Sequence, residues 1–309
     1  MFKVFIDGQE GTTGLQLAQR LQRRDDIELL KIDDALRKDE SERAKRMNQA
    51  DLVFLCLPDA AAAEAVKLVT NDNTRVIDAS TAHRVAPGWA YGFPELSKAH
   101  RAAIASGKRI ANPGCYATGF LAIAYPLVKL GLIGPEALLT CHAVSGYSGA
   151  GKKGIAQYEA PGRAAEYDSP RLYALGLNHK HLPEMQQVAG LMHPPLFNPQ
   201  VCGFYAGMTV SVPLWAGQFA KSISAASLKD ALREFYDGAK LITIEGAPES
   251  GFLPANLLAG TNRLNLYVFG NGEQLTLVSA LDNLGKGASG AAMQNMNLAL
   301  GLDEYQGLL

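Results

Sequence analysis

The sequence predicts an α/β protein in which a Rossmann-type dinucleotide-binding domain is joined to an α+β domain with a mainly antiparallel sheet. Up to about residue 113, short apolar strands alternate with helices, which indicates a parallel sheet covered on both faces. The first strand, residues 2–7, leads directly into a glycine-rich turn and a helix, as in dinucleotide-binding folds. Beyond residue 200 the strands are longer and partly alternating, a pattern typical of antiparallel sheets.

The glycine-rich turn has the spacing GxxGxxG, a variant of the dinucleotide-binding pattern GxGxxG. Gly8 permits a sharp turn, Gly11 lets the backbone approach a pyrophosphate, and Gly14 lets the helix pack closely on the strand. Thr12 and Thr13 stand at the start of the helix, whose N–H groups attract phosphate. We therefore expect a cofactor site here; the alternative is a structural glycine turn.

The second predicted strand, residues 27–32, ends at an acidic pair that begins with Asp33. An acid about 20 residues beyond the glycines commonly binds a ribose 2′-hydroxyl and favours NAD. Four cations stand nearby and suit a 2′-phosphate instead. They are Lys31, Arg37, Lys38 and Arg43. The residues alone leave NAD and NADP open.

Two further strands of the predicted parallel sheet cover residues 51–58 and 74–80. Ligands of such sheets bind at the carboxyl ends of the strands. Pro58 and Ser80 are therefore candidates for contact with the cofactor, and Arg84 is a candidate for contact with the substrate. Each of these residues equally suits a solvated loop.

Cys115 is the candidate nucleophile. The sequence predicts a short strand over 108–112, a tight turn at Asn112-Pro113-Gly114, and a helix over 116–131. A thiol in the first helical turn faces unpaired N–H groups and the positive end of the dipole, which lower its pKa below about 8.5. The same position also suits a small buried cysteine. Asn112, in the turn, is a candidate substrate ligand.

His181 is the candidate general base, and His179 can substitute for it in that role. Pro183 suits the first position of the helix that follows, and the positive end of that helix favours neutral imidazole, the form that a base requires. Pro183 favours extended geometry at Leu182. If residues 179–181 are extended, both rings lie on one face, and Glu184 is a candidate to orient or polarise one of them. The alternatives are two surface histidines or a metal site. No metal is expected, because no paired Cys or His ligands accompany them.

A loop of glycines, hydroxyls and two lysines follows the predicted strand 137–144. Ser145, Gly146 and Lys152 supply a hydroxyl, a backbone N–H and a positive charge, which suit a phosphate or carboxylate. The loop is not a Walker A motif, because Lys153 stands where that motif has Ser or Thr. A flexible hairpin with solvated lysines is the alternative.

The second half of the chain sets the expected domain boundaries. Its predicted strands are 201–215, 240–245, 263–269 and 274–281, and its predicted helices are 227–238 and 289–300. We expect a dinucleotide-binding domain over 1–114, completed by 284–309, and a catalytic and dimerisation domain over 115–283. Asn283 and Gly285 are expected to face the nicotinamide, although a plain glycine turn fits as well.

Composition narrows the class of protein. The 309 residues are enough for two domains, and a net charge of −1 without a basic block argues against nucleic acid as a partner. No run of 18 apolar residues and no signal-peptide pattern is present, so we expect no membrane partner and a cytoplasmic location. Four cysteines fit reduced thiols in such a compartment.

The chain resembles the N-acetyl-γ-glutamyl-phosphate reductases of the shorter type, within the semialdehyde dehydrogenase superfamily, over essentially its whole length. The motifs that carry the resemblance are Gly8–Gly14, Leu55–Asp59, Asp78–Arg84, Asn112–Tyr116, Ser145–Lys152, His179–Glu184 and Asp282–Gly287. The resemblance implies NADP(H), and a step of arginine biosynthesis in which N-acetyl-γ-glutamyl phosphate is reduced to the semialdehyde and phosphate is released. It also implies a homodimer or homotetramer built through the second domain.

The resemblance implies roles for individual residues. Cys115 attacks the acyl phosphate and forms a thioester, and His181 or His179 moves the proton. Two other functions stay open. Aspartate-semialdehyde dehydrogenase uses the same chemistry and differs in its acyl pocket. A cofactor-sensing protein on a dinucleotide fold needs neither Cys115 nor His181.

Overall fold

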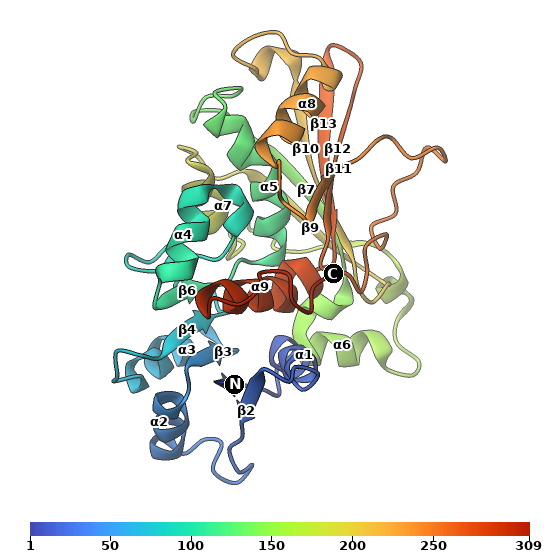
Figure 1. The fold of residues 1–309 in the computed structure, drawn as a ribbon. Coiled ribbons are helices and arrows are strands. Elements are labelled where there is room, and N and C mark those ends of the chain that lie inside the picture. The colour runs from blue at the N-terminus through green and yellow to red at the C-terminus, as the bar shows by residue number, and fades with distance from the viewer. The chain divides into compact units, whose positions relative to one another are not determined.

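The computed structural model describes residues 1–309, which divide into two compact units, each with its own sheet (Figure 1). The first unit comprises Met1–Pro113 and Ala288–Leu309, and the second comprises Gly114–Gly287. No helix is both long enough and apolar enough to cross a membrane.

The first unit is built on a six-stranded sheet. Its strands are β1 (Phe2–Asp7), β2 (Ile27–Leu30), β3 (Leu52–Leu55), β4 (Arg75–Asp78), β5 (Ala90–Tyr91) and β6 (Arg109–Ala111). They lie in the order β2-β1-β3-β4-β6-β5, and every neighbouring pair is parallel. The predicted parallel sheet is therefore confirmed, and the turns that follow its strands share one edge.

Helices cover this sheet. They are α1 (Thr12–Leu21), α2 (Glu40–Gln49), α3 (Asp59–Ala65), α4 (Lys98–Ser106) and α9 (Gly290–Ala299), with short 3₁₀ turns η1 (Val66–Leu68) and η2 (Pro94–Leu96). All four residues of β3 are buried, as expected for a strand with both faces covered. On one side Phe5, Val53 and Val76 of the sheet pack with Met47 of α2 and Ala65 of α3.

The C-terminal helix α9 is held in the first unit by buried polar contacts. Gln294 Nε2 donates to Glu95 Oε1 at 2.8 Å, and Asn295 Nδ2 donates to the Gly92 carbonyl at 2.9 Å. Both amide side chains are fully buried. A buried amide without partners costs free energy, so these bonds fix where α9 lies on the sheet.

The second unit is built on a seven-stranded sheet in the order β11-β12-β13-β10-β7-β9-β8. Its strands are β7 (Thr140–Gly146), β8 (Arg171–Leu172), β9 (Leu196–Cys202), β10 (Met208–Trp215), β11 (Ile242–Ile244), β12 (Leu264–Gly270) and β13 (Gln274–Leu281). Its helices are α5 (Cys115–Lys129), α6 (Gly151–Glu159), α7 (Leu182–Ala189) and α8 (Ala225–Phe235), with short turns η3 (Tyr147–Ala150), η4 (Ala165–Asp168) and η5 (Ala216–Gln218). The π-helical η6 (Gly285–Ser289) contains the last residues of this unit and the first residues of the C-terminal segment of the first unit. Antiparallel pairs predominate, but β7–β9 and β11–β12 are parallel, so the sheet is mixed.

One predicted strand was wrong. Residues 201–215 are not a single strand, because β9 ends at Cys202 and β10 begins at Met208. Gly207 has φ +107°, a conformation that favours glycine, and it breaks the strand. The turn contains apolar residues, which is why the hydrophobic pattern ran through it.

Helix α5 is the central helix of the second unit. It is buried on nearly all sides and packs against β10 and β13. Gly119 lets it approach the sheet, since a Cβ there would lie 2.6 Å from Val210 Cγ2. Ser279 Oγ of β13 donates to the Gly119 carbonyl at 3.0 Å. The sheet therefore fixes the helix that begins with Cys115.

Candidate active site

Cys115 is the first residue of α5, and its side chain is partly exposed. Gly114 precedes it with φ −78° and ψ 149°, and no side chain caps the helix. The Thr118 N–H and hydroxyl both bond the Gly114 carbonyl, at 2.8 and 3.0 Å. The first N–H groups of a helix have no acceptor within it, so this turn presents donors beside the thiol.

Glu184 holds the residue before Cys115. Its Oε1 accepts the Gly114 N–H at 2.9 Å, and its side chain is 1% exposed. This hydrogen bond connects α7 to the turn that carries Cys115; that the carboxylate also orients a histidine stays a prediction. The N–H groups of Tyr116 and Ala117, in the first turn of α5, have no acceptor within the helix.

His181 and His179 lie together in a turn. The rings meet edge to face with centroids 4.7 Å apart, and His181 is buried. Residues 179–181 are not extended, so the condition for both rings to share a strand face is not met: His181 has φ −86° and ψ −8°, and the Leu182 N–H bonds the His179 carbonyl at 3.0 Å. Helix α7 begins at Leu182, so Pro183 occupies the second helical position rather than the first.

The tautomer of neutral His179 follows from its contacts. Its Nδ1 accepts the His181 backbone N–H at 3.1 Å, so the ring proton lies on Nε2. That Nε2 lies 3.4 Å from the Tyr173 hydroxyl. His179 thereby supports the turn that presents His181.

Two tyrosines that the sequence did not single out surround the histidines. The Tyr116 ring lies 5.7 Å from His179 and 5.9 Å from His181, and 6.4 Å from Tyr173. Burial raises the pKa of both phenols, and a charge on Cys115 raises them further, so both stay neutral at pH 7. Tyr116 follows Cys115 at a helix start, a signal available in the sequence; Tyr173 has no such signal.

Residues 145–152 and 283–287 also lie in the second unit. The Ser145 hydroxyl donates to the Gly146 carbonyl at 3.1 Å and is hydrogen-bonded to Tyr116, while Lys152 is exposed in the first turn of α6. Asn283 Oδ1 accepts the Gly207 N–H at 2.9 Å, and its Nδ2 donates to Ser148 Oγ at 2.8 Å. These contacts make Asn283 a support for the loop that follows β7.

Two glycines after Asn283 sit where no side chain fits. A Cβ on Gly285 would lie 2.0 Å from the Thr261 carbonyl oxygen, and one on Gly287 would lie 2.8 Å from Cys115 Cβ. Gly287 therefore packs directly against Cys115. Sequence reasoning did not single it out, because a contact between residues so far apart in the chain leaves no local pattern.

The glycine turn of the first unit has the geometry of a phosphate site. Gly8 has φ +86°, and its missing Cβ would lie 2.4 Å from the Cys56 carbonyl oxygen. A Cβ on Gly14 would lie 2.5 Å from the Gly8 carbonyl oxygen, so the helix packs closely on the turn. Helix α1 begins at Thr12, whose buried Oγ1 has no hydrogen-bond partner. An unpartnered hydroxyl beside free helix N–H groups fits a dinucleotide pyrophosphate.

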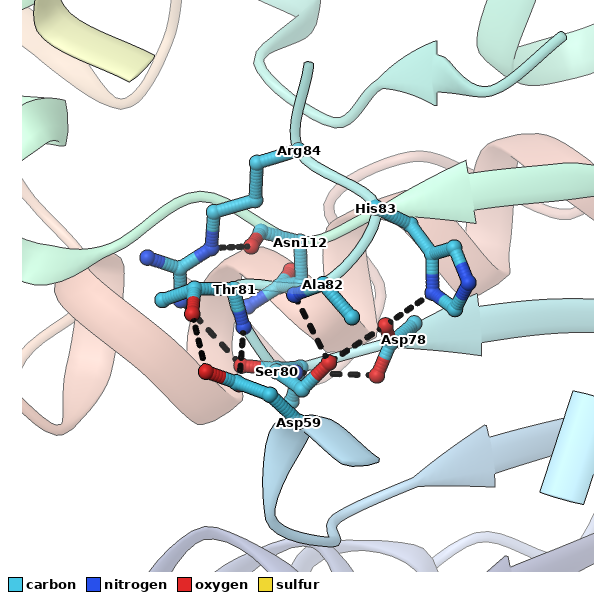
Figure 2. A network of polar contacts seen from close by, with 9 residues as sticks. Asp59, Asp78, Ser80, Thr81, Ala82, His83, Arg84 and Asn112 are labelled. Carbon is cyan, nitrogen blue, oxygen red and sulfur yellow. Dashed lines mark hydrogen bonds and ion pairs between the residues drawn. The ribbon is translucent and has the colours of Figure 1, made fainter. Parts of the chain in front are cut away.

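A polar network occupies the turn after β4 (Figure 2). Asp78 is fully buried and accepts from Ser80 Oγ and contacts His83 Nδ1, both at 2.6 Å. Thr81 is bonded to Asp59 through its N–H at 2.8 Å. Ser80, a predicted cofactor ligand, therefore has its hydroxyl engaged with Asp78.

Arg84 and Asn112 join this turn to the end of β6. Arg84 Nε donates to the Asn112 carbonyl at 3.0 Å, and its Nη2 donates to the Ala79 carbonyl at 3.1 Å (Figure 2). Asn112 Nδ2 donates to the Ala288 carbonyl at 3.1 Å, and its Oδ1 accepts from Asn295 at 3.1 Å. These contacts fix the backbone three residues before Cys115; binding of substrate by either residue stays a prediction.

The remaining predicted cofactor residues are also placed. Asp33 Oδ1 accepts the Ala35 N–H at 2.8 Å, and Pro58 precedes the first residue of α3. No group of three or more His, Cys, Asp or Glu side chains is arranged to hold a metal ion.

Comparison with known proteins gives the family. Residues 3–104 match the NAD-binding domain of semialdehyde dehydrogenases, and residues 115–283 match their dimerisation domain. N-acetyl-gamma-glutamyl-phosphate reductase 2 of a Nostoc species is 46% identical over 320 residues, which cover 99% of both chains. The reductase of Brucella ovis is 47% identical over 306 residues, covering 97% of this chain and 99% of that one. The chain belongs to the N-acetyl-γ-glutamyl-phosphate reductase family.

Solved structures agree on the fold of this reductase family member. Aspartate semialdehyde dehydrogenase II of Vibrio cholerae has a TM-score of 0.71 at 16% identity, covering 97% of this chain and 98% of that one. Aspartate semialdehyde dehydrogenase with NADP from Candida albicans has a TM-score of 0.70 at 17% identity, covering 96% and 98%. At these identities the likeness shows a shared fold alone.

We expect iodoacetamide to label Cys115 first at pH 7 to 8. Burial, together with the Asp78 and Asp7 carboxylates, raises the pKa of Cys56 to about 12, and burial raises the pKa of Cys141 and Cys202. These three thiols therefore stay protonated and unreactive in this range, because only thiolate alkylates. Peptide mass spectrometry over time, with Cys115→Ser as the control, measures the order. Earlier labelling of any other cysteine would contradict this account.

We expect Glu184→Ala to lower kcat by about 100-fold, because a small displacement of a reacting group costs about that much. Glu184→Gln retains an oxygen that can accept from Gly114, so its kcat should stay within roughly tenfold of wild type. The pH profile of Cys115 alkylation, measured alongside, reports on the nucleophile rather than on folding. Equal kcat values for the alanine variant and the wild type would show that the Gly114 contact does not position Cys115.

Proposed function

We propose that the protein reduces N-acetyl-γ-glutamyl phosphate to N-acetylglutamate semialdehyde with NADPH, releasing phosphate, as a step of arginine biosynthesis. The single observation that carries this proposal is the identity of 46% with a reductase of that name over 99% of both chains. Cys115 at the start of α5 and the buried His181 support the chemistry, since a nucleophile and a base are the groups that the reaction needs.

In the proposed first step Cys115 is acylated. The Cys115 thiol gives its proton to His181, and Sγ attacks the carbonyl carbon of the acyl phosphate. The N–H groups of the first turn of α5 stabilise the oxyanion. The new C–S bond forms and the bond between the carbonyl carbon and the phosphate oxygen breaks. The departing phosphate takes a proton from solvent and leaves as HPO₄²⁻. His179 is the substitute for His181 in moving the proton.

The second step returns the enzyme to its starting state. NADPH, when bound, supplies a hydride to the carbonyl carbon of the thioester. The resulting alkoxide re-forms a carbonyl and expels the Cys115 thiolate as the aldehyde leaves. The thiolate takes back the proton held by His181, so no net proton remains on the enzyme.

We assign the cofactor and substrate contacts by the same reasoning. The glycine turn and the start of α1 hold the pyrophosphate, because their backbone and hydroxyl groups fit it. The residues are Gly8, Gly11, Thr12, Thr13 and Gly14. The further cofactor candidates are Asp33, Pro58, Ser80, Asn283 and Gly285. The substrate candidates are Arg84, Asn112, Ser145, Gly146 and Lys152. The cations among them complement a phosphate and a carboxylate.

We further propose a homodimer or homotetramer assembled through the second unit, and a cytoplasmic location. The match of residues 115–283 to a dimerisation domain supports the assembly. Trp215, at the end of β10, is 60% exposed, which is unusual for so large an apolar side chain. The nucleophile needs a reduced thiol, which a reducing compartment maintains.

The test is phosphate-dependent reduction of NADP⁺ with N-acetylglutamate semialdehyde or aspartate semialdehyde as substrate. We expect a kcat/KM at least about 100-fold higher for the former, because a pocket built for the acetyl amide leaves polar groups unpaired with the smaller substrate. A preference for aspartate semialdehyde would be consistent with the proposed reaction mechanism but would contradict the proposed substrate.

Cys115→Ser is the matched control, because it removes the thiolate and changes little else. We expect it to bind NADPH with unchanged affinity and to show no turnover above background. Wild-type-like turnover would overturn the thioester route. Binding of NADPH by the wild type without turnover of either aldehyde would favour a sensor.

A further inference from the structure

Two arginines from the segment after β2 contact acids at either side of the first glycine. Arg37 forms an ion pair through Nη1 with Glu10 Oε1, in the middle of the glycine turn. Arg43 contacts Asp7, the last residue of β1, through Nη2 at 2.6 Å and Nε at 3.3 Å. The edge of the proposed pyrophosphate site therefore carries two guanidinium groups.

The position of Arg37 after β2 is important because this segment contacts the cofactor in dinucleotide-binding folds. The segment after β2 faces the adenosine ribose of a bound dinucleotide, where an acid accepts from the 2′-hydroxyl of NAD and an arginine accommodates the 2′-phosphate of NADP. Asp33 is the acid in that position, but its Oδ1 already accepts the Ala35 N–H at 2.8 Å. Arg37 is in the same segment, and its ion pair with Glu10 keeps it beside the glycine turn.

The two arginines differ in how firmly they are held. The side chains of Arg43 and Asp7 are 19% and 7% exposed, and the guanidinium contacts the carboxylate through two nitrogens. The side chains of Arg37 and Glu10 are 45% and 63% exposed, and one nitrogen makes the contact. Exposed ion pairs contribute little to stability, so Arg37 can leave Glu10 for another partner at a small cost in free energy. Separating the largely buried Arg43–Asp7 pair would cost more.

We propose that Arg37 recognises the 2′-phosphate of NADPH and that Glu10 competes with this phosphate for the Arg37 guanidinium. The 2′-phosphate carries up to two negative charges and accepts two parallel N–H bonds from a guanidinium, so it displaces a single carboxylate contact. Arg37 then determines specificity for NADPH over NADH. Glu10 lowers the affinity for NADPH, because its carboxylate must leave before the phosphate can bind. This inference rests on the proposed NADPH-dependent function.

The test is the Kd of NADPH and of NADH, measured by dinucleotide fluorescence with the full chain at fixed ionic strength. We expect Arg37→Ala to raise the Kd for NADPH by about 10- to 100-fold and to leave the Kd for NADH within about twofold. Glu10→Gln should lower the Kd for NADPH by about two- to fivefold, since it removes a weak, exposed competitor. Arg23→Ala removes an exposed arginine elsewhere in the first unit and should change neither value.

Retained NADH binding shows that each variant is folded. An equal loss of NADPH and NADH affinity in Arg37→Ala would overturn the proposal, because Arg37 would then only support the turn. Weaker NADPH binding in Glu10→Gln would overturn the competition. Failure of the wild type to bind either dinucleotide would instead contradict the proposed function itself.

Discussion

The hydrogen bond from the Gly114 N–H to Glu184 is the contact on which the candidate active site of the second unit depends. It connects the start of α5 to the first turn of α7, so Cys115 and His181 are both placed by one buried contact. Helix α5 cannot move to compensate, because it is buried and bonded to β13 through Ser279. The carboxylate accepts the Gly114 N–H, and in the proposed mechanism the N–H groups of the first turn of α5 stabilise the oxyanion.

In the first unit, glycines and a polar network together shape the edge where parallel strands end. Gly8 and Gly14 have no Cβ at positions where one would collide with a backbone carbonyl oxygen of another residue. Asp78 gathers Ser80 and His83, and Arg84 bonds the carbonyl of Asn112. Much of this polar character is structural, because a tightly folded turn of polar residues needs its hydrogen bonds satisfied internally. The unpartnered Thr12 hydroxyl differs from these groups, which is why it suits a ligand.

Local patterns predicted much of this architecture. The parallel sheet, the strand over Gln274–Leu281 and the helix after Gly114, expected over 116–131 and found over Cys115–Lys129, follow from periodicity and turn residues that act within a few positions. The contacts of Glu184 with Gly114 and of Gly287 with Cys115 join residues far apart in the chain, and no local pattern encodes them. The sequence did not predict the turn at His181. A residue before proline usually avoids helical geometry, but Leu182, which precedes Pro183, is the first residue of α7.

In the proposed reaction the substrate becomes attached to Cys115 before any reduction takes place. Intact-protein mass spectrometry after mixing with N-acetyl-γ-glutamyl phosphate, without NADPH, tests this directly. We predict an increase equal to one N-acetylglutamyl group, located by peptide mapping at Cys115 and lost when NADPH is added. No adduct, or an adduct on another residue that survives in Cys115→Ser, would contradict the central role of this thiol.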